Sequence, residues 1–281
     1  MREVRREAPS TGRLLFAAEQ LVRNNRFTIA VVFPVIGGAM LLASAWDLLP
    51  PVLAFNPLLI LVGVLVMRSP LVVALAPLID RRALAILSGL TVYTYAIEYV
   101  GLKTGWPYGE FQYLAELGPV VAGVPIALPI LFLPLVLNAV LLTVLVLGRL
   151  GRSRVLRLLV AIGIVLGIDL ILDPAAVALG FWTYEQGVYY GVPLSNYAGW
   201  LLSGTVAVLA IDLAFDRAAL LDRLEACSFA LDDLVSFTLL WGVINVAYGN
   251  WIPVVLTIGL VIGLAATPRF SLAIPRLATA E

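Results

Sequence analysis

The feature that most constrains this chain is a succession of long apolar segments separated by charged or aromatic connections. Segments of near-spanning length cover residues 27–49, 52–79, 83–101, 124–147, 155–179 and 197–215. A last apolar stretch, 234–267, is too long for one span and breaks naturally at Tyr248-Gly249-Asn250. Because a helix needs about 20 apolar residues to cross a bilayer, the pattern predicts an all-α, polytopic membrane bundle of seven to eight transmembrane helices.

Composition agrees with that fold class. Hydrophobic residues make up 62% of the 281 residues and charged residues 13%, which is typical of an integral membrane protein. The formal net charge is zero, so nothing steers the chain towards nucleic acid and we expect no such partner. We expect three regions: a basic N-terminal arm (1–26), a transmembrane catalytic domain (27–268) and a short tail (269–281).

The basic residues predict how the bundle is oriented. With the N-terminus inside, 16 of the 18 lysines and arginines fall on cytoplasmic segments, as the positive-inside rule favours. Arg68 should extend its side chain towards the same surface, and Lys103 falls on the other side. We therefore expect a multi-pass protein of the cell membrane with a cytoplasmic N-terminus and tail. The connections 102–123 and 180–196 would then share the opposite side.

The chain has no histidine and a single cysteine, Cys227. These counts exclude His-ligated haem, His-box di-iron sites, zinc-histidine sites and Ser-His triads. They also exclude cysteine-cluster metal sites and an internal disulfide. Acid–base chemistry must therefore come from Asp, Glu, Tyr or Lys side chains.

Glu98, Asp169 and Asp173 fall in apolar segments, where an ionised carboxylate is costly. Asp169 and Asp173, at positions i and i+4, share one helix face, and Glu98 should lie at a depth comparable to that of Asp173. If the helices that carry them are neighbours, the three carboxyls converge in a low-dielectric pocket, and at least one of them stays protonated. A neutral acid beside an ionised one can donate and accept protons, so these three are the candidate catalytic residues.

Other roles for these acids stay open at this stage. They could hydrogen-bond to backbone groups freed by Pro174, or pair with Lys103. The spacing of Asp169 and Asp173 would also allow the pair to hold Mg²⁺ and a diphosphate.

Aromatic and amide side chains gather around the same two connections. Trp and Tyr concentrate at membrane interfaces, which explains many of them, but their π faces would also stabilise a carbocation. Asn138, Asn196 and Asn245 are expected to hydrogen-bond between helices, and Asn196 is the strongest functional candidate of the three. The candidate substrate-binding residues are Tyr95, Trp106, Tyr108, Trp182, Tyr189, Tyr190, Asn196 and Trp200.

The two connections also resemble each other. The first contains Glu98, Gly105-Trp106, Tyr113 and Gly123-Val124-Pro125. The second contains Asp173, Phe181-Trp182, Tyr189-Tyr190 and Gly191-Val192-Pro193. Either a helix-loop-helix unit is duplicated, or two aromatic, Gly-rich loops are alike by chance.

Two blocks of residues resemble the signatures of a known family. The first block is Glu98-Tyr99-Val100-Gly101 with Lys103-Thr104-Gly105-Trp106-Pro107-Tyr108-Gly109 and Gly123-Val124-Pro125. The second is Asp169-Leu170-Ile171-Leu172-Asp173-Pro174, Trp182, Tyr189-Tyr190-Gly191-Val192-Pro193-Leu194 and Asn196-Tyr197-Ala198-Gly199-Trp200. Over residues 27–268 the chain resembles the CruF-type carotenoid biosynthesis family.

The resemblance implies a carotenoid hydratase that needs no cofactor and no metal. Such an enzyme adds water to the terminal isopropylidene C=C bonds of an acyclic carotenoid. In the archaeal branch, which we favour, bisanhydrobacterioruberin becomes bacterioruberin, a fifty-carbon tetraol; bacterial relatives hydrate the open end of gamma-carotene. The partners would be the carotenoid, water, membrane lipid and other membrane enzymes of the pathway. The resemblance carries no assignment of catalytic residues.

Three rival functions stay open. A membrane prenyltransferase would use the two aspartates to hold its metal, although Lys103 is the only base on that side. A carotene cyclase would form the same cation but capture it with an internal double bond. A non-enzymatic transporter is the third, because intramembrane acids also mark proton paths.

Overall fold

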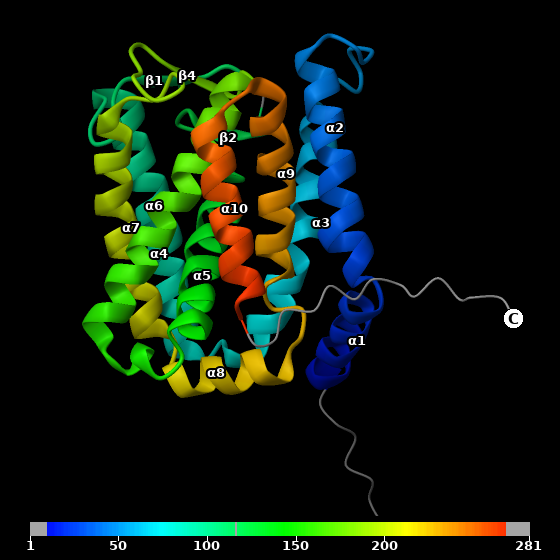
Figure 1. Cartoon of the computed structure of the whole chain (residues 1–281), viewed down its shortest axis with the longest axis vertical. Helices are drawn as coiled ribbons and strands as arrows, with labels where there is room; N and C mark the ends of the chain where they lie inside the picture. Colours follow the sequence, from blue (N-terminus) through cyan, green and yellow to red (C-terminus); the bar gives the residue numbers. More distant parts are fainter. Residues whose placement is uncertain (1–9, 116, 268–281) are drawn as a thin grey trace, which may run out of the picture.

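The computed structural model describes residues 10–115 and 117–267, and most of them are helical. Within these residues, six helical segments are long and apolar enough to cross a membrane. They are the π-helical turn η1 with α2 (Thr28–Val32 and Phe33–Ala45), α3 with the short η2 (Pro57–Leu75 and Ala76–Leu78), α4 (Arg81–Thr104), α5 (Leu128–Leu147), α6 (Arg154–Ala178) and α7 (Leu194–Ala214). Two shorter helices, α9 (Asp232–Tyr248) and α10 (Trp251–Ala265), run alongside them (Figure 1). The prediction of an all-α membrane bundle is confirmed.

The remaining elements lie at the two ends of the bundle. Helix α1 (Ser10–Asn24), the turn η3 (Leu150–Arg152) and helix α8 (Arg217–Ala226) are at one end, with α8 lying across it (Figure 1). Four short strands lie at the other end: β1 (Phe111–Tyr113), β2 (Val120–Val121), β3 (Val124–Pro125) and β4 (Trp182–Tyr184). The expected tail, 269–281, and residues 1–9 of the expected N-terminal arm lie outside the described residues.

Polar residues and glycines set the helix ends. The side chain of Asn56 accepts hydrogen bonds from the amides of Leu58 and Leu59, which starts α3 just before Pro57. Asp80, Ser153 and Asp216 cap α4, α6 and α8 in the same way. Gly249 has a left-handed φ of 70° and ends α9, at the break that the sequence predicted.

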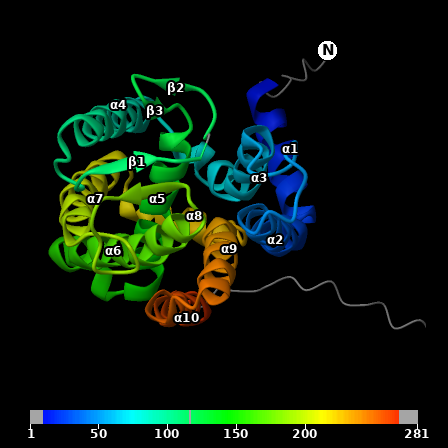
Figure 2. The same cartoon turned by 90° about the horizontal axis from the view of Figure 1, so that it is seen from above.

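Helix α5 is the central helix of the bundle. It packs against α3, α4, α6 and α7. On one side of it, α4 packs on α7 and α6 packs on α7; on the other, α2, α3 and α9 pack together, with α10 against α9 and α6 (Figure 2). The bundle therefore has two halves that meet along α5, α6 and α9.

The strands show that the two aromatic connections meet. β1 and β4 pair antiparallel, with Phe111 opposite Tyr184 and Tyr113 opposite Trp182. β2 and β3 form a separate hairpin. The connections 102–123 and 180–196 therefore share one end of the bundle, as expected, and this end is opposite α8 (Figure 1).

The end near α8 contains charge-paired acids. Arg26 makes a bidentate ion pair with Asp232, with both N–O distances at 2.8 Å. Arg154 and Arg157 both pair with Asp212, which joins α6 to α7. These acids have cations beside them and serve to hold segments together.

Arg68 corrects one expectation. Its side chain does not extend to a membrane surface: the residue is only 8% exposed and its Nη1 lies 2.7 Å from Oδ1 of Asp233, which is fully buried. Asn138 donates a hydrogen bond to the other carboxylate oxygen of Asp233. The Arg68 side chain is buried rather than extended to the surface because its ion pair with Asp233 neutralises both charges. Together with Asn138, the pair links α3, α5 and α9.

This arrangement predicts a specific pattern of stabilities. Arg68→Met leaves the Asp233 charge buried without a cation and should cost about 3–5 kcal/mol of unfolding free energy. Arg68→Met combined with Asp233→Asn removes both charges and keeps an amide partner for Asn138, so it should recover most of the loss. Unfolding in detergent can be followed with a thiol-reactive dye, because Cys227 is the single cysteine and is buried.

The matched control is Arg154→Met. The Arg154 side chain is 57% exposed and Asp212 keeps Arg157 as a partner, so the cost should be about 1 kcal/mol or less. An unchanged unfolding transition in Arg68→Met would contradict a structural role for the buried pair.

Candidate active site

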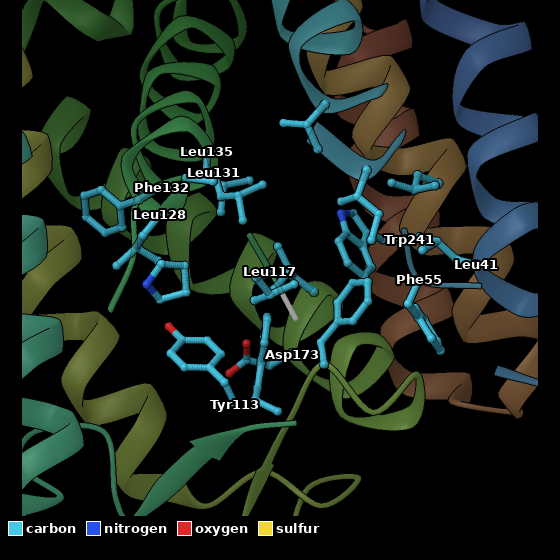
Figure 3. A pocket seen from close by; sticks show the side chains of 18 of the residues that line it. Leu41, Phe55, Tyr113, Leu117, Leu128, Leu131, Phe132, Leu135, Asp173 and Trp241 are labelled. Carbon is cyan, nitrogen blue, oxygen red and sulfur yellow. The ribbon is translucent and has the colours of Figure 1, made fainter. Parts of the chain in front are cut away.

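A cavity of about 230 Å³ lies inside the bundle beneath the paired strands. Helices α2 to α7 and α9 contribute to its walls, together with β1 and β4, and most of the lining side chains are apolar. Figure 3 shows Asp173 and Tyr113 at one end, near the strands, and Leu131 and Leu135 at the other. The cavity is thus an apolar chamber with polar groups concentrated at the strand end.

Asp169 and Asp173 are held by a single amide. They lie one turn apart on α6, and Asn196, in the first turn of α7, donates from Nδ2 to Oδ2 of Asp173 and to Oδ2 of Asp169 (3.3 Å). All three residues are at most 3% exposed. Asp173 lines the cavity together with Asn196, whereas Asp169 is not among the lining residues. The predicted interhelical role of Asn196 is confirmed, and its amide links Asp169 to the cavity-lining Asp173.

Glu98 reaches the same cavity from α4. It lines the wall together with Asp173, and the Tyr113 hydroxyl donates a hydrogen bond to its Oε1. The convergence expected for Glu98 and Asp173 is therefore present. α4 and α6 both pack against α7 and α5, which brings the two carboxyls to one chamber from two sides.

Each of these two carboxyls has a tyrosine partner from its own connection. Tyr113 on β1 donates to Glu98, and Tyr184 on β4 donates to Oδ2 of Asp173 at 3.2 Å. Burial, followed by the nearby carboxyls Glu98 and Asp173, raises the pKa of both tyrosines well above the ordinary value. Both hydroxyls therefore keep their protons and act as hydrogen-bond donors.

The acids at this end differ from those near α8. Within the described residues, no ion pair involves Glu98, Asp169 or Asp173, and their hydrogen-bond donors are the neutral side chains of Tyr113, Tyr184 and Asn196. Oδ1 of Asp169 is buried without a hydrogen-bond partner among these residues. Buried carboxyls without a cation are costly to keep, which points to a chemical use.

The other two roles considered for the acids do not match the geometry. Pro174 frees the carbonyl of Leu170, and the Tyr189 hydroxyl, not an acid, donates to that oxygen. Lys103 is exposed and lies over the ring of Tyr99, 5.8 Å from its centroid. The carboxyls therefore stay available to the cavity.

The two connections share an internal architecture. Each follows an acid-bearing helix with an aromatic-x-Tyr strand, Phe111-Gln112-Tyr113 in one and Trp182-Thr183-Tyr184 in the other. The pairing is centred on Gln112 opposite Thr183, so a local two-fold axis relates the strands. The tyrosine of each strand returns to the carboxyl of the helix before it.

The turns that follow are alike as well. Ala122 and Gly123 have φ angles of 53° and 90°, and Tyr190 and Gly191 have 50° and 84°. Both pairs occupy two-residue turns with positive φ at each position, and Val-Pro follows each turn before the next helix. A left-handed non-glycine residue at the same place twice supports duplication over chance.

The structure changes the correspondence predicted from the sequence. From the sequence, Tyr113 corresponds to Tyr189-Tyr190 and Trp106 to Trp182. The register instead makes Tyr113 the counterpart of Tyr184. Tyr113 and Tyr184 were missing from the predicted site; the repeated aromatic-x-Tyr pattern after each acidic helix is the signal that would have found them.

Half of the predicted substrate-binding residues line the cavity. They are Tyr108, Trp182, Asn196 and Trp200. The Tyr108 hydroxyl is 2.7 Å from Ser203 Oγ, and Trp200 stacks on Phe132 with ring centroids 5.5 Å apart. These contacts fix the aromatic faces that the cavity presents.

The other four lie outside the cavity lining, each for a local reason. The Tyr95 hydroxyl donates to the carbonyl of Ile126, and Trp106 is 59% exposed in its loop. In the turn at 189–192, the Tyr189 hydroxyl donates a hydrogen bond to the carbonyl of Leu170 on α6. The Tyr190 hydroxyl accepts one from the amide of Ile252. Their positions fit roles in holding the loops rather than in lining the cavity.

The sequence matches a known family and a named protein. Residues 55–264 match the family described as carotenoid biosynthesis protein. The chain is 58% identical over 253 residues to a protein of Haloarcula japonica named bisanhydrobacterioruberin hydratase, covering 90% of this chain and 86% of that protein. No solved structure matches. With three-quarters of its length in the family match and a relative this close, the chain belongs to the carotenoid biosynthesis protein family.

Proposed function

We propose that this protein is a carotenoid hydratase, which adds water across the terminal isopropylidene C=C bonds of bisanhydrobacterioruberin to give bacterioruberin. The name of the Haloarcula japonica relative supports the substrate and the reaction. The observation that carries the proposal is that Asp173 and Glu98 reach one apolar cavity from two helices, and that their hydrogen-bond donors among the described residues are neutral.

The proposed reaction begins with proton transfer. Asp173, in its protonated form, donates its proton to the less substituted alkene carbon, and the π electrons form the new C–H bond. The positive charge remains on the tertiary carbon. The ring faces of Trp182, Tyr108 and Trp200 in the cavity wall would stabilise this cation.

Water then completes the addition. Its oxygen forms a bond to the tertiary carbon, and Glu98, oriented by the Tyr113 hydroxyl, accepts the proton that the water loses. The product has gained one hydrogen and one hydroxyl, and Glu98 gains the proton that Asp173 lost. One proton transfer between them restores the enzyme. No redox or metal-ion step is required, so we propose that the reaction is independent of a cofactor.

Asn196 is proposed as a positioning residue. Its amide fixes the orientation of Asp173 and is anchored on the other side by Asp169. The same contact argues against a prenyltransferase, because an amide donor occupies the position between the two carboxyls where that reaction needs a divalent cation.

We also propose that the end with α1 and α8 faces the cytoplasm, so that the catalytic end of the cavity lies in the outer half of the membrane. The distribution of arginines supports this orientation, since Arg81 and Arg154 are the first residues of α4 and α6 at that end and Arg223 lies on α8.

Replacing the acids tests the proposal. In cells that make the anhydro precursor, Asp173→Asn and Glu98→Gln should each lower alcohol formation by about 10² to 10⁴, the usual contribution of general acid–base catalysis. Asp169→Asn should cost less, because Asp169 does not line the cavity. Glu110→Gln, in the exposed part of the first connection, is the matched control.

The masses of the pigments, measured by mass spectrometry, distinguish the possible reactions. Gains of whole water molecules mark a hydratase, unchanged mass with shifted absorption a cyclase, and added prenyl units a transferase. Wild-type hydration by both Asp173→Asn and Glu98→Gln would remove these acids from the mechanism.

The tyrosine partners give a separate test. Tyr113→Phe and Tyr184→Phe keep the ring and remove one hydrogen bond to a carboxyl, which should lower the hydration rate by about 10- to 100-fold. Tyr99→Phe, at an exposed position on α4, should leave the rate unchanged. Initial rates on solubilised protein, with unfolding temperatures measured in parallel, separate loss of orientation from loss of fold.

A further inference from the structure

The cavity is too small for the whole substrate of the proposed function. Its volume is about 230 Å³, and a protein cavity of about 150 Å³ holds one benzene molecule, so this one takes an end group of about ten carbons. The rest of a fifty-carbon polyene must lie outside. The question is therefore where the chain leaves the cavity.

Several sides of the cavity are closed. β1 and β4, with their Phe111–Tyr184 and Tyr113–Trp182 ring contacts, cover the strand end. The ion pair of Arg68 with Asp233 lies towards α9, and Trp241 of α9 forms part of the same wall. α6 and α7 pack closely on each other behind Asp173 and Asn196.

On the side of α3 that faces away from α9, the cavity is not closed. Leu59 lies nine residues before Arg68, which places it on the opposite side of the helix at 3.6 residues per turn. Leu59 lines the cavity and is also 43% exposed, so the cavity reaches the outer surface of the bundle here. Gly63, one turn further along the same flank, lines the cavity too, and a Cβ at Gly63 would meet nothing within 4 Å.

Helix α4 forms the other side of this flank. Thr94 and Ile97 of α4 line the cavity, while α5 packs against both α3 and α4 and contributes Leu131 behind them. Seen from the strand end, α3 and α4 lie at the same edge of the bundle, with the β2–β3 connection above the space between them (Figure 2). Apart from Thr94, whose hydroxyl donates a hydrogen bond to the carbonyl of Leu90, these lining residues are apolar.

We propose that the opening between α3 and α4, with Gly63 in its wall, is the binding groove for the polyene, which leaves the cavity sideways into the bilayer. This inference rests on the proposed function for the identity of the bound molecule. One end group occupies the cavity beneath Tyr113 and Tyr184, and the conjugated chain runs past Gly63 into lipid. Gly63 determines which substrate lengths can bind, because glycine has no side chain and leaves room for a polyene that extends beyond the cavity.

Gly63→Phe tests the groove directly. Binding of the carotenoid to the full-length protein in detergent can be followed by quenching of tryptophan emission, since Trp182, Trp200 and Trp241 line the cavity. The added ring should raise the carotenoid Kd by about 10-fold or more. A ten-carbon acyclic terpene with the same isopropylidene end fits inside the cavity, and its Kd, measured by competition, should stay unchanged.

Gly259→Phe is the matched control. Gly259 is a helical glycine of α10 that is exposed, has nothing within 4 Å of an added Cβ and does not line the cavity. It should bind both molecules like the wild type. A carotenoid Kd equal to that of the wild type in Gly63→Phe would contradict the proposed groove. An equal increase in the Kd of the short terpene would contradict it as well.

Hydration is measured in the same samples and tests the proposed function separately. Length-selective loss of binding in Gly63→Phe supports the groove whether or not the wild type forms alcohol. Absence of alcohol from the bound carotenoid would count against the proposed function and leave the groove in place.

Discussion

Antiparallel pairing of β1 with β4 is the constraint on which the site depends. The two strands come from connections about 70 residues apart, and their register places Tyr113 over Glu98 and Tyr184 over Asp173. Strands of three residues are weak on their own, so the ring contacts between them, Phe111 with Tyr184 and Tyr113 with Trp182, help to hold them together. The same pairing covers the strand end of the cavity, next to Glu98 and Asp173.

The acidic side chains inside the bundle have two kinds of partner. Near α8, Asp212, Asp232 and Asp233 each have an arginine within ion-pair distance. At the strand end, Glu98, Asp169 and Asp173 are held by hydroxyl and amide groups. A compensated pair is structurally stable but chemically inert, whereas a carboxyl held by neutral donors can still lose or gain a proton. The separation of these two kinds of acid is the physical basis of the proposed mechanism.

Much of the fold could be predicted from local sequence signals. Apolar length gave the helices, Gly249 gave the break between α9 and α10, and the i to i+4 spacing placed Asp169 beside Asp173. The amide of Asn245 bonds to the carbonyl of Ile171 on α6, as expected of an interhelical asparagine. These features depend on a few neighbouring residues, which is why the sequence alone was sufficient.

The parts that could not be predicted depend on distant pairing. The roles of Tyr113 and Tyr184 follow from the β1–β4 register, and the burial of Arg68 follows from its contact with Asp233, 165 residues away. Tyr189 and Tyr190 look like site residues in the sequence, yet the turn they occupy points them to α6 and α10. The aromatic composition identified the two connections that cover the cavity, but it did not show which of their aromatic side chains face the cavity.

The most direct test of the account follows the atoms of the added water. Purified protein is given the anhydro carotenoid in water enriched in heavy oxygen, and separately in deuterium oxide, and the products are analysed by mass spectrometry and NMR. Acid-catalysed hydration predicts one heavy oxygen on the tertiary carbon and one deuterium on the neighbouring carbon for each alcohol formed. Oxygen drawn from dissolved O₂, or an alcohol with no carbon-bound deuterium, would contradict protonation by a buried acid followed by capture of the cation by water.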